Sequence, residues 1–398
     1  MKVVQIGAAY VGAQKEIEYA IHKFLIDNGI CSTILYCVGN SNEGNIIRCE
    51  TKIESLLRRF LVKMCGKHPV FGMASTIRII KKIKHFEPDV VHLHVLHHNF
   101  IDYPLLFRYL IKKQIPVVYT MHDMWAFTGG CYHYSNYNCN GFLKYCRGCT
   151  NRDIDCNCKS TNKKLEEKKY FYAHLKNIAF VSVSDWVNSE LEKSFLRKYC
   201  HKTIWNAYQL PTDFQILQTR NKVNQKKRIV GVANNWDKRK GFFDFLLLAE
   251  KLGNDYEVIL IGNISDSIKK DIPQNVIFLG IISDKKELLR QYAAADLHVS
   301  MSCEETFGLT FIEAAAVGTR SIGFNLTAIP YVLNKIGGIV VQNHNVKEMV
   351  NTIKDFFEKS DSYKLTNKEV QNAKDFFCIS KMAGEYFDIY KSALEGKC

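Results

Sequence analysis

The sequence lacks a long hydrophobic run. No stretch of the 398 residues approaches the roughly 18 apolar residues that a membrane-spanning helix needs, so we expect none. Low-complexity segments and internal repeats are also missing, and a hydrophobic share of 47% with 24% charged residues is typical of a folded globular protein, not a disordered or fibrous one. The apolar stretch Val3–Ala13 has a single Lys ahead of it and no polar cleavage region behind it. We therefore interpret it as a buried strand running into a glycine loop, not as a signal peptide.

Acidic residues are scarce relative to basic ones, with 40 Asp and Glu against 54 Lys and Arg, which gives a net charge of +14. The excess is +11 in residues 1–200 (28 against 17) and +3 in the remainder (26 against 23). Between Lys52 and Lys84 the only acidic residue is Glu54, while the basic residues are Lys52, Arg58, Arg59, Lys63, Lys67, Arg78, Lys81, Lys82 and Lys84. Such a patch favours an anionic surface as its partner.

Short β-rich runs alternate with longer helical patterns along most of the chain. Most of the runs are apolar on both faces, as a parallel sheet covered by helices requires. In the first half they are Val3–Gly7, Thr33–Val38, Val90–His94, Val117–Met121, Ala179–Val183 and Thr203–Trp205. In the second half they are Arg228–Ala233, Glu257–Gly262, Val276–Leu279, Leu297–Ser300, Arg320–Gly323 and Gly338–Val341. The helical stretches between them include Phe243–Leu252, Lys285–Ala294 and Leu309–Val317.

This alternation predicts an α/β fold with two doubly wound, Rossmann-like domains in series. We expect the first domain in residues 1–205, the second in residues 206–380, and a C-terminal helix in residues 381–398 that packs back toward the first domain. The boundary is expected in the polar stretch Asn206–Asn224, which contains Pro211 and breaks the alternation. The active site is expected in the cleft between the domains.

The strongest functional signal is the segment Glu304–Gly318. A strand ends near Ser302, Gly308 allows a close approach to the backbone, and an Ala-rich helix begins near Leu309 and carries Glu313. The amides at the start of such a helix suit a diphosphate, and the carboxylates of Glu305 and Glu313 can accept hydrogen bonds from sugar hydroxyls. Structural capping is the alternative, because acidic residues near a helix start also stabilise its dipole.

The segment Glu305–Glu313 resembles the paired-glutamate motif of the retaining glycosyltransferases called family 4, which have the two-domain GT-B fold. The resemblance implies that Glu305 contacts the donor sugar, that the backbone of Phe307, Gly308 and Leu309 contacts sugar and phosphate, and that Glu313 holds the ribose. It further implies that the domain 206–380 binds the nucleotide sugar and that the domain 1–205 lies on the acceptor side.

A second segment lies 65 residues earlier and reads Gly231–Phe242. A strand delivers a loop with three consecutive cations, Lys238, Arg239 and Lys240, just before a helix. Charge and helix dipole together favour a diphosphate, although a solvated basic turn is the alternative. The segment resembles the Lys-Gly element of family 4, with Lys240 as the diphosphate ligand. The family often has an Arg where this chain has Asn235, so Arg239 or Lys238 is the candidate for that contact.

The third segment is Tyr119–Cys131, in which a strand presents His122 at its carboxyl edge. A lone His in this position is more often structural than catalytic, but the segment closely resembles glycosyltransferases of the exopolysaccharide and colanic-acid type. The resemblance extends to Pro88–His94 and Ala328–Pro330, covers most of residues 85–345, and implies that His122 approaches the reacting sugar.

Further histidines lie close to this segment. His92 and His94 share one face of a strand, and His97 and His98 follow. A metal site is conceivable, but no acidic or thiol partner is near in sequence. We therefore expect these histidines to line the cleft and to contact the acceptor.

Six cysteines fall in the loop 131–158: Cys131, Cys139, Cys146, Cys149, Cys156 and Cys158. Four thiolates at such spacing can form a tetrahedral zinc site, which would stabilise a loop of about 30 residues without regular structure. We predict a structural zinc ion on Cys131, Cys139, Cys146 and Cys149, with a disulfide pair or reduced thiols as alternatives. Four Cys ligands leave no open position, so a catalytic zinc is not expected.

Within the basic patch, six apolar residues follow the i, i+3, i+4, i+7 rule of a helix: Ile53, Leu56, Leu57, Phe60, Leu61 and Met64. A basic amphipathic helix can rest on anionic lipid, with each cation contributing about 1 kcal/mol near the surface. The alternative is a crossover helix with a solvated charged face. Because family members of this type elongate lipid-linked saccharides, we favour lipid contact and a peripheral, cytoplasmic location at the inner face of the cell membrane.

The motif order predicts a retaining hexosyltransferase that uses a nucleotide diphosphate sugar donor and a saccharide acceptor, lipid-linked, in surface polysaccharide assembly. Cations and helix amides would stabilise the leaving diphosphate, so we expect no cofactor to be required for catalysis. A GT-B sugar-nucleotide epimerase and a phosphorylase are alternative enzyme activities. A phosphorylase should carry a pyridoxal-binding Lys, and we identify none. A nucleic-acid partner is not expected, because the cysteine loop lacks interleaved basic and aromatic residues in sufficient density.

Overall fold

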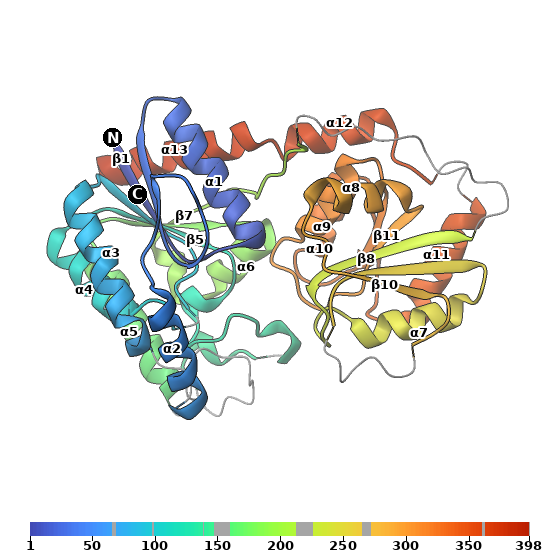
Figure 1. Ribbon diagram of the computed structural model, residues 1–398, viewed down its shortest axis with the longest axis horizontal. Helices are drawn as coiled ribbons and strands as arrows, with labels where there is room; N and C mark the ends of the chain where they lie inside the picture. Colours follow the sequence, from blue (N-terminus) through green and yellow to red (C-terminus); the bar gives the residue numbers. More distant parts are fainter. Residues whose placement is uncertain are drawn as a thin grey trace. The chain divides into compact units, whose positions relative to one another are not determined.

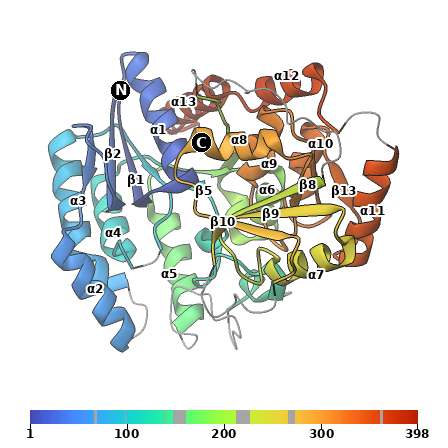
Figure 2. The same ribbon diagram turned by 45° about the vertical axis from the view of Figure 1, so that its right-hand side comes forward.

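The computed structural model describes residues 1–65, 69–97, 99–137, 139–146, 160–211, 226–264, 272–359 and 363–397. The chain divides into two compact units, shown in Figures 1 and 2. The first contains Met1–Asn206 and Ile379–Cys398, and the second contains Ala207–Cys378. Among the described residues, no helix combines the length and the apolar composition that crossing a membrane requires.

The first unit contains a seven-stranded parallel sheet with the strand order β3-β2-β1-β4-β5-β6-β7. The inner strands are buried on both faces, as in β5, where all five residues are buried, and apolar β-branched residues suit this environment. The strands are β1 (Lys2–Tyr10), β2 (Cys31–Gly39), β3 (Ile46–Arg48), β4 (Val90–Leu93), β5 (Val117–Met121), β6 (Ile178–Ser182) and β7 (Cys200–Thr203).

Helices cover both faces of this sheet (Figure 2). α1 and α13 pack against each other, while α4 packs against both α3 and α5. The helices are α1 (Gly12–Asp27), α2 (Lys52–Cys65), α3 (Met73–Phe86), α4 (Tyr103–Lys113), α5 (Thr161–His174), α6 (Asp185–Lys193) and α13 (Ile379–Glu395), with 3₁₀ turns at Pro69–Gly72, Trp125–Phe127, Ser135–Tyr137, Gly141–Leu143 and Phe195–Lys198. α13 thus follows the second unit in sequence but belongs to the core of the first.

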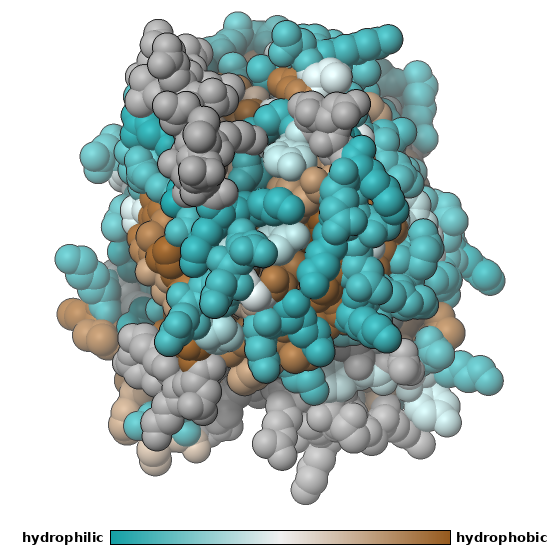
Figure 3. All heavy atoms as spheres, turned by 90° about the vertical axis from the view of Figure 1, so that its right-hand side faces the viewer, coloured by the Kyte–Doolittle hydropathy of each residue, from teal (hydrophilic) through white to brown (hydrophobic). Residues whose placement is uncertain are grey.

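The second unit contains a six-stranded parallel sheet with the order β10-β9-β8-β11-β12-β13. Its strands are β8 (Lys227–Asn235), β9 (Tyr256–Asn263), β10 (Val276–Gly280), β11 (Leu297–Ser300), β12 (Ser321–Phe324) and β13 (Ile339–Val341). Its helices are α7 (Phe242–Leu252), α8 (Lys285–Ala294), α9 (Leu309–Ala316), α10 (Ile329–Lys335), α11 (Val346–Lys359) and α12 (Asn367–Phe376). The side of this unit that faces the viewer in Figure 3 carries mainly hydrophilic side chains, with hydrophobic ones visible between them.

Each sheet has a point where the strand order reverses, between β1 and β4 in the first unit and between β8 and β11 in the second. Ligands of open α/β sheets bind in the crevice at the carboxyl ends of the strands flanking such a point. The loop after β8 carries the basic segment with Lys240, and the loop after β11 carries the acidic segment with Glu305. The loop after β5 carries His122. The predicted α/β fold class is therefore confirmed, and it brings the candidate residues to the sheet edges where ligands bind.

Candidate functional site

In the second unit, the loops after β8 and β11 bring Lys240 and Glu305 together. The ammonium of Lys240 donates a hydrogen bond to Oε1 of Glu305 and forms an ion pair with it. The two loops fit closely, because a Cβ placed on Gly241 would lie 2.2 Å from the carbonyl oxygen of Met301. With a φ of +70° as well, position 241 requires glycine. Lys240 and Glu305, predicted from separate segments, thus lie in contact, and donor binding between their loops stays a prediction.

Glu305 remains a carboxylate in a mostly buried position. Burial by itself would raise its pKa, but the charge and hydrogen bond of Lys240, with a further contribution from Arg239, lower the pKa below its ordinary value. Its backbone is fixed by Thr327, whose Oγ1 accepts from the amide of Glu305 at 3.0 Å. Acidic and basic side chains therefore meet here, since Arg239 also lies 3.9 Å from Oδ2 of Asp237.

Glu313 lies one turn into α9 and is buried. Lys285 donates to its Oε1 at 2.5 Å, and the hydroxyl of Tyr292 donates to its Oε2 at 3.2 Å. Both donors come from α8. Each carboxylate oxygen still has acceptor capacity, since an ionised carboxylate offers about four lone-pair sites. Lys285 and Tyr292 were not predicted, because their separation from Glu313 along the chain carries no local signal.

The other predicted donor residues lie in the same two loops. Nη1 of Arg239 is 3.5 Å from the carbonyl oxygen of Glu304. Phe307 is buried, and its ring packs edge-on against Phe377, so only its backbone is available to a ligand. Gly308, with a φ of +90°, precedes α9, which begins at Leu309 and has no side-chain cap hydrogen bond at its start. The position of a phosphate at this helix end stays a prediction.

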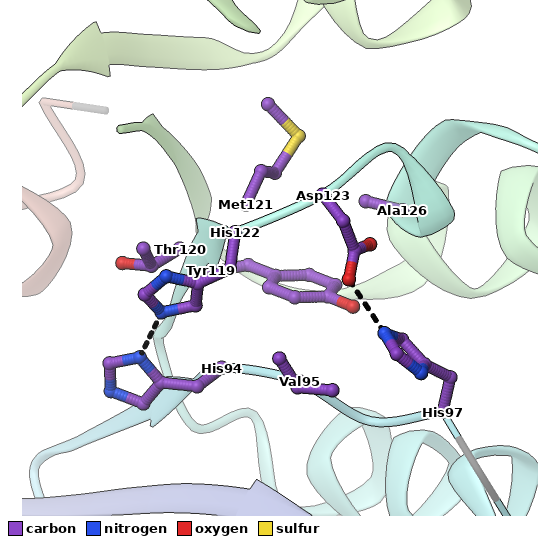
Figure 4. A pocket seen from close by; sticks show the side chains of 9 residues that line it. All are labelled: His94, Val95, His97, Tyr119, Thr120, Met121, His122, Asp123 and Ala126. Carbon is purple, nitrogen blue, oxygen red and sulfur yellow. Dashed lines mark hydrogen bonds and ion pairs between the residues drawn. The ribbon is translucent and has the colours of Figure 1, made fainter. Parts of the chain in front are cut away.

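In the first unit, a small pocket lies beside the carboxyl ends of β4 and β5 and is lined by His94, His97, His122 and Asp123, among others (Figure 4). Nε2 of His97 is 2.6 Å from Oδ2 of Asp123. Burial would raise the pKa of Asp123, but His97 and the amide of Trp125 hold it well below its usual range. Asp123 therefore brings one fixed negative charge to the pocket wall.

The protonation of His122 is set by a chain of hydrogen bonds that starts at Gln5 on β1. Nε2 of Gln5 donates to the carbonyl oxygen of Glu18 at 3.2 Å, which turns Oε1 toward Nε2 of His94 at 3.1 Å. An amide oxygen only accepts, so Nε2 of His94 must carry its hydrogen. Burial lowers the pKa of His94 well below its ordinary value, so the ring is neutral and its Nδ1 is an acceptor.

Nδ1 of His94 faces Nε2 of His122 at 3.0 Å, and Figure 4 shows this contact as a dashed line. Because Nδ1 accepts, Nε2 of His122 donates. Burial lowers the pKa of His122 to about 4, so this ring is also neutral. The hydrogen-bond pattern therefore assigns the hydrogen of His122 to Nε2 and leaves Nδ1 as an acceptor suited to a ligand hydroxyl.

The expectation of cleft lining is wrong for His92, whose side chain is 0% exposed. His94 is also 0% exposed but does belong to the wall of the pocket. His92 is bonded on both ring nitrogens, to Oγ1 of Thr120 and to the hydroxyl of Tyr390 on α13, each at 2.7 Å. Packing of α13 against β4, β5 and β6 explains this burial. His94 instead acts through His122, and His98 lies outside the described residues.

Three of the four predicted zinc ligands are described. Cys131, Cys139 and Cys146 are half-buried and form no disulfide, and Sγ of Cys131 donates to the carbonyl oxygen of His133 at 2.8 Å. Cys149 lies outside the described residues. Zinc binding by this loop therefore stays a prediction.

Two family models match the chain: one described as "Glycosyltransferase Family 4" over residues 47–157, the other as "Glycosyl transferases group 1" over residues 213–376. The chain is 26% identical over 332 residues to an "Uncharacterized 41.2 kDa protein in cps region" of Klebsiella pneumoniae, covering 79% of this chain and 82% of that protein. It is 21% identical over 402 residues to the "Putative colanic acid biosynthesis glycosyl transferase WcaC" of Escherichia coli strain K12, covering 96% and 97%.

Among solved structures, HepE of Anabaena in complex with UDP-glucose superposes with a TM-score of 0.64 at 12% identity, covering 98% of this chain and 100% of HepE. At this identity the likeness shows the fold alone. The two family matches fall one in each structural unit, and the group 1 match contains Lys240, Glu305 and Glu313.

Proposed function

We propose that the chain, whose two units each match a glycosyltransferase family model, is a retaining hexosyltransferase of the family 4 type with the GT-B fold. It would transfer a hexose from a nucleotide diphosphate sugar to a lipid-linked saccharide during surface polysaccharide assembly. The observation that carries the proposal is the contact of Lys240 with Glu305, which joins the loops after β8 and β11, while Glu313 lies in the helix α9 that follows the second loop. The names of two relatives, one from a cps region and one for colanic acid biosynthesis, support the assignment to polysaccharide assembly.

The proposed chemistry relies on charge. The leaving diphosphate gains negative charge as the glycosidic bond breaks, and Lys240, Arg239 and the start of α9 would stabilise that charge. Glu305 would orient sugar hydroxyls, and Glu313, held by Lys285 and Tyr292, would accept from the ribose. We assign no protein nucleophile, because same-face attack assisted by the leaving phosphate accounts for retention. On this proposal neither a metal nor another cofactor takes part in the transfer.

His122 would serve the sugar from the first unit. Its Nδ1 is an acceptor by the hydrogen-bond argument above, so a sugar hydroxyl would donate to it. A charged imidazolium is disfavoured at His122 by burial, which lowers the pKa of the ring to about 4. His122 is therefore proposed as a neutral hydrogen-bond acceptor and not as a general acid.

The transfer proposal is tested by measuring binding and slow hydrolysis of a panel of nucleotide sugars by the wild type, Lys240→Ala and Glu305→Gln. We expect one donor class to bind the wild type, and each variant to lose about 100-fold or more in turnover. Lys251→Ala removes an exposed cation in the last turn of α7 and is the matched control, expected to stay within about threefold of the wild type. Wild-type binding and turnover in both site variants would contradict the site.

We further propose that α2 rests on an anionic membrane surface. Its apolar side is exposed, with Ile53 at 78% and Phe60 at 60% exposure, and Leu56, Leu57 and Met64 are exposed as well. Val70, Met73 and Ile77, in the elements that follow, extend the exposed apolar set. Exposed apolar residues at helical spacing flanked by Arg59 and Lys63 fit a helix lying in a lipid interface better than a solvated crossover helix.

This membrane proposal is tested by flotation with vesicles that contain or lack anionic lipid. The double variant Leu57→Ser and Phe60→Ser should lose binding to anionic vesicles while keeping hydrolysis of the soluble donor, because α2 is remote from the donor loops in sequence and belongs to the other unit. Leu143→Ser and Tyr145→Ser, which alter exposed residues of another loop, form the matched control. Equal flotation of the α2 variant and the wild type would rule the proposal out.

A further inference from the structure

Asp244, Cys303 and His344 converge at the carboxyl edge of the second sheet. Asp244 lies in the first turn of α7, Cys303 follows β11, and His344 follows β13. Nε2 of His344 is 3.5 Å from Sγ of Cys303 and 3.5 Å from Oδ2 of Asp244. One ligand atom from each residue lies within 4.8 Å of the other two. Neither the sequence motifs nor the proposed transfer uses these three side chains.

The two separations from Nε2 of His344 match the edges of a metal tetrahedron. With Zn–N near 2.05 Å and Zn–S near 2.3 Å, tetrahedral ligands place N and S about 3.6 Å apart, and N and O about 3.4 Å apart. Both observed distances lie close to these values. The Nε2 to carboxylate distance exceeds the usual range for a charge-assisted hydrogen bond. A single ring nitrogen also cannot donate its one hydrogen fully to both a thiol and a carboxylate, whereas a metal ion satisfies all three groups.

Each of the three groups is held by its own element. α7 begins directly after Gly241, which packs on the carbonyl of Met301. The amide of Cys303 donates to the carbonyl oxygen of Arg239 at 2.9 Å. The ring of His344 packs edge-on against Phe324, with centroids 4.6 Å apart. Three donors fixed from three separate elements form a preorganised set.

We propose that Asp244, Cys303 and His344 bind a divalent transition-metal ion of the zinc class, with water in the fourth position. The thiol would release its proton as the metal–sulfur bond forms, and the thiolate and the carboxylate would then balance the charge of the ion. Thiolate and imidazole ligands select zinc-class ions over Mg²⁺. The side chains of His344 and Asp244 are 40% and 33% exposed, so an ion can enter from solvent.

The proposal is tested with the reduced, chelator-treated full-length protein, titrated with Co²⁺ while the thiolate-to-cobalt absorption is recorded. The wild type should bind one more thiolate-ligated cobalt ion than Cys303→Ser. Comparing these two proteins removes any signal from the cysteine loop 131–158, which both share. Cys378→Ser, which removes another half-buried thiol of the second unit, should bind like the wild type. Equal cobalt stoichiometry in Cys303→Ser and the wild type would overturn the proposal.

Affinity for Zn²⁺, measured by competition with a chromophoric chelator, tests the other two ligands. We expect His344→Ala and Asp244→Asn each to weaken this site by at least about tenfold, since even outer-shell changes weaken metal sites by such factors. Mg²⁺ at the same concentrations should not raise the thermal midpoint of the wild type. Loss of binding in Cys303→Ser with unchanged affinity in both other variants would show a lone reactive thiol and would refute the three-ligand site.

Discussion

The carboxyl edges of the two sheets hold polar groups of opposite electrostatic kinds. In the first unit, His94 and His122 are neutral, because burial lowers the pKa of both rings and hydrogen bonds satisfy their inward nitrogens. In the second unit, Glu305 and Glu313 face lysines and lie in ion pairs. Burial thus keeps these two imidazoles uncharged, whereas Glu305 and Glu313 lie against lysines. The first edge also carries the ionised Asp123 beside His97, so the contrast is between the His94–His122 pair and the two carboxylate–lysine pairs.

The largest effect is expected from breaking a pair in the charged edge. Lys240→Ala leaves the carboxylate of Glu305 mostly buried without its cation, which should lower the free energy of unfolding by about 3 kcal/mol. The double variant Lys240→Ala with Glu305→Gln removes both charges and should recover most of this loss. Urea unfolding of the wild type, the two single variants and the double variant measures these free energies. Additive losses in the double variant would show that the two side chains do not interact.

In the neutral edge, His122→Ala should lower kcat/KM for transfer by about 100-fold, because a hydroxyl of the reacting sugar loses its acceptor. His122→Asn places an amide oxygen near the position of Nδ1 and should restore about tenfold of that loss. Initial-rate kinetics with the donor found in the panel measure both. If His122→Asn is no better than His122→Ala, the acceptor role of Nδ1 is wrong.

A smaller effect is expected from Gln5, which acts on His122 only through His94. Gln5→Leu removes the acceptor that keeps hydrogen on Nε2 of His94, so both rings become free to exchange tautomers, and kcat should fall by about tenfold. Imidazole ¹⁵N NMR should show the Nε2–H form of His122 in the wild type and a mixture in Gln5→Leu. Gln114→Leu, on an exposed helix end, is the control. An unchanged tautomer in Gln5→Leu would disprove the relay.

The smallest effect is the pH dependence of stability. The folded-state pKa of His122 is about 4, below that of an unfolded His near 6.5, so unfolding takes up protons and stability should fall as the pH drops from about 6.5 to 4. Glu305 has a lowered pKa, so its contribution should fall only below the unfolded value of about 4.3. Thermal midpoints of the wild type and His122→Asn at pH 7, 6 and 5 test this, and equal slopes would contradict it.

Much of the fold follows from sequence patterns. The strand Val117–Met121 and the helix Lys285–Ala294 match their predicted bounds, and α7 and α9 differ from theirs by one residue. A continuous hydrophobic run indicates a strand that is buried on both faces, as the strands of a helix-covered parallel sheet are. The short edge strand β3 (Ile46–Arg48) was missed because it contains only two apolar residues and ends on Arg48, too short a pattern to indicate a strand.

The candidate site was predicted less completely. Lys240 and Glu305 stand in loops, and Glu313 in an Ala-rich helix, whose composition is distinctive, so the sequence singles them out, and Lys240 does contact Glu305. Gln5 and Lys285 could not, because each acts on a residue far away in sequence and lies in an ordinary strand or helix. Which distant residues come into contact depends on the order of strands in the sheet and on helix packing, and hydrophobic patterns do not reveal either.

The anchoring of α2 affects how the protein behaves in water. Arg58 is buried, with its Nε 2.7 Å from Oε1 of Glu50 and its guanidinium 4.0 Å from the centre of the Phe100 ring. The helix therefore cannot roll its apolar residues inward without unpairing Glu50, a costly step for two buried charges. Purified material without detergent or lipid should accordingly self-associate with rising concentration, and sedimentation velocity would register this as a shift to larger species that added detergent reverses.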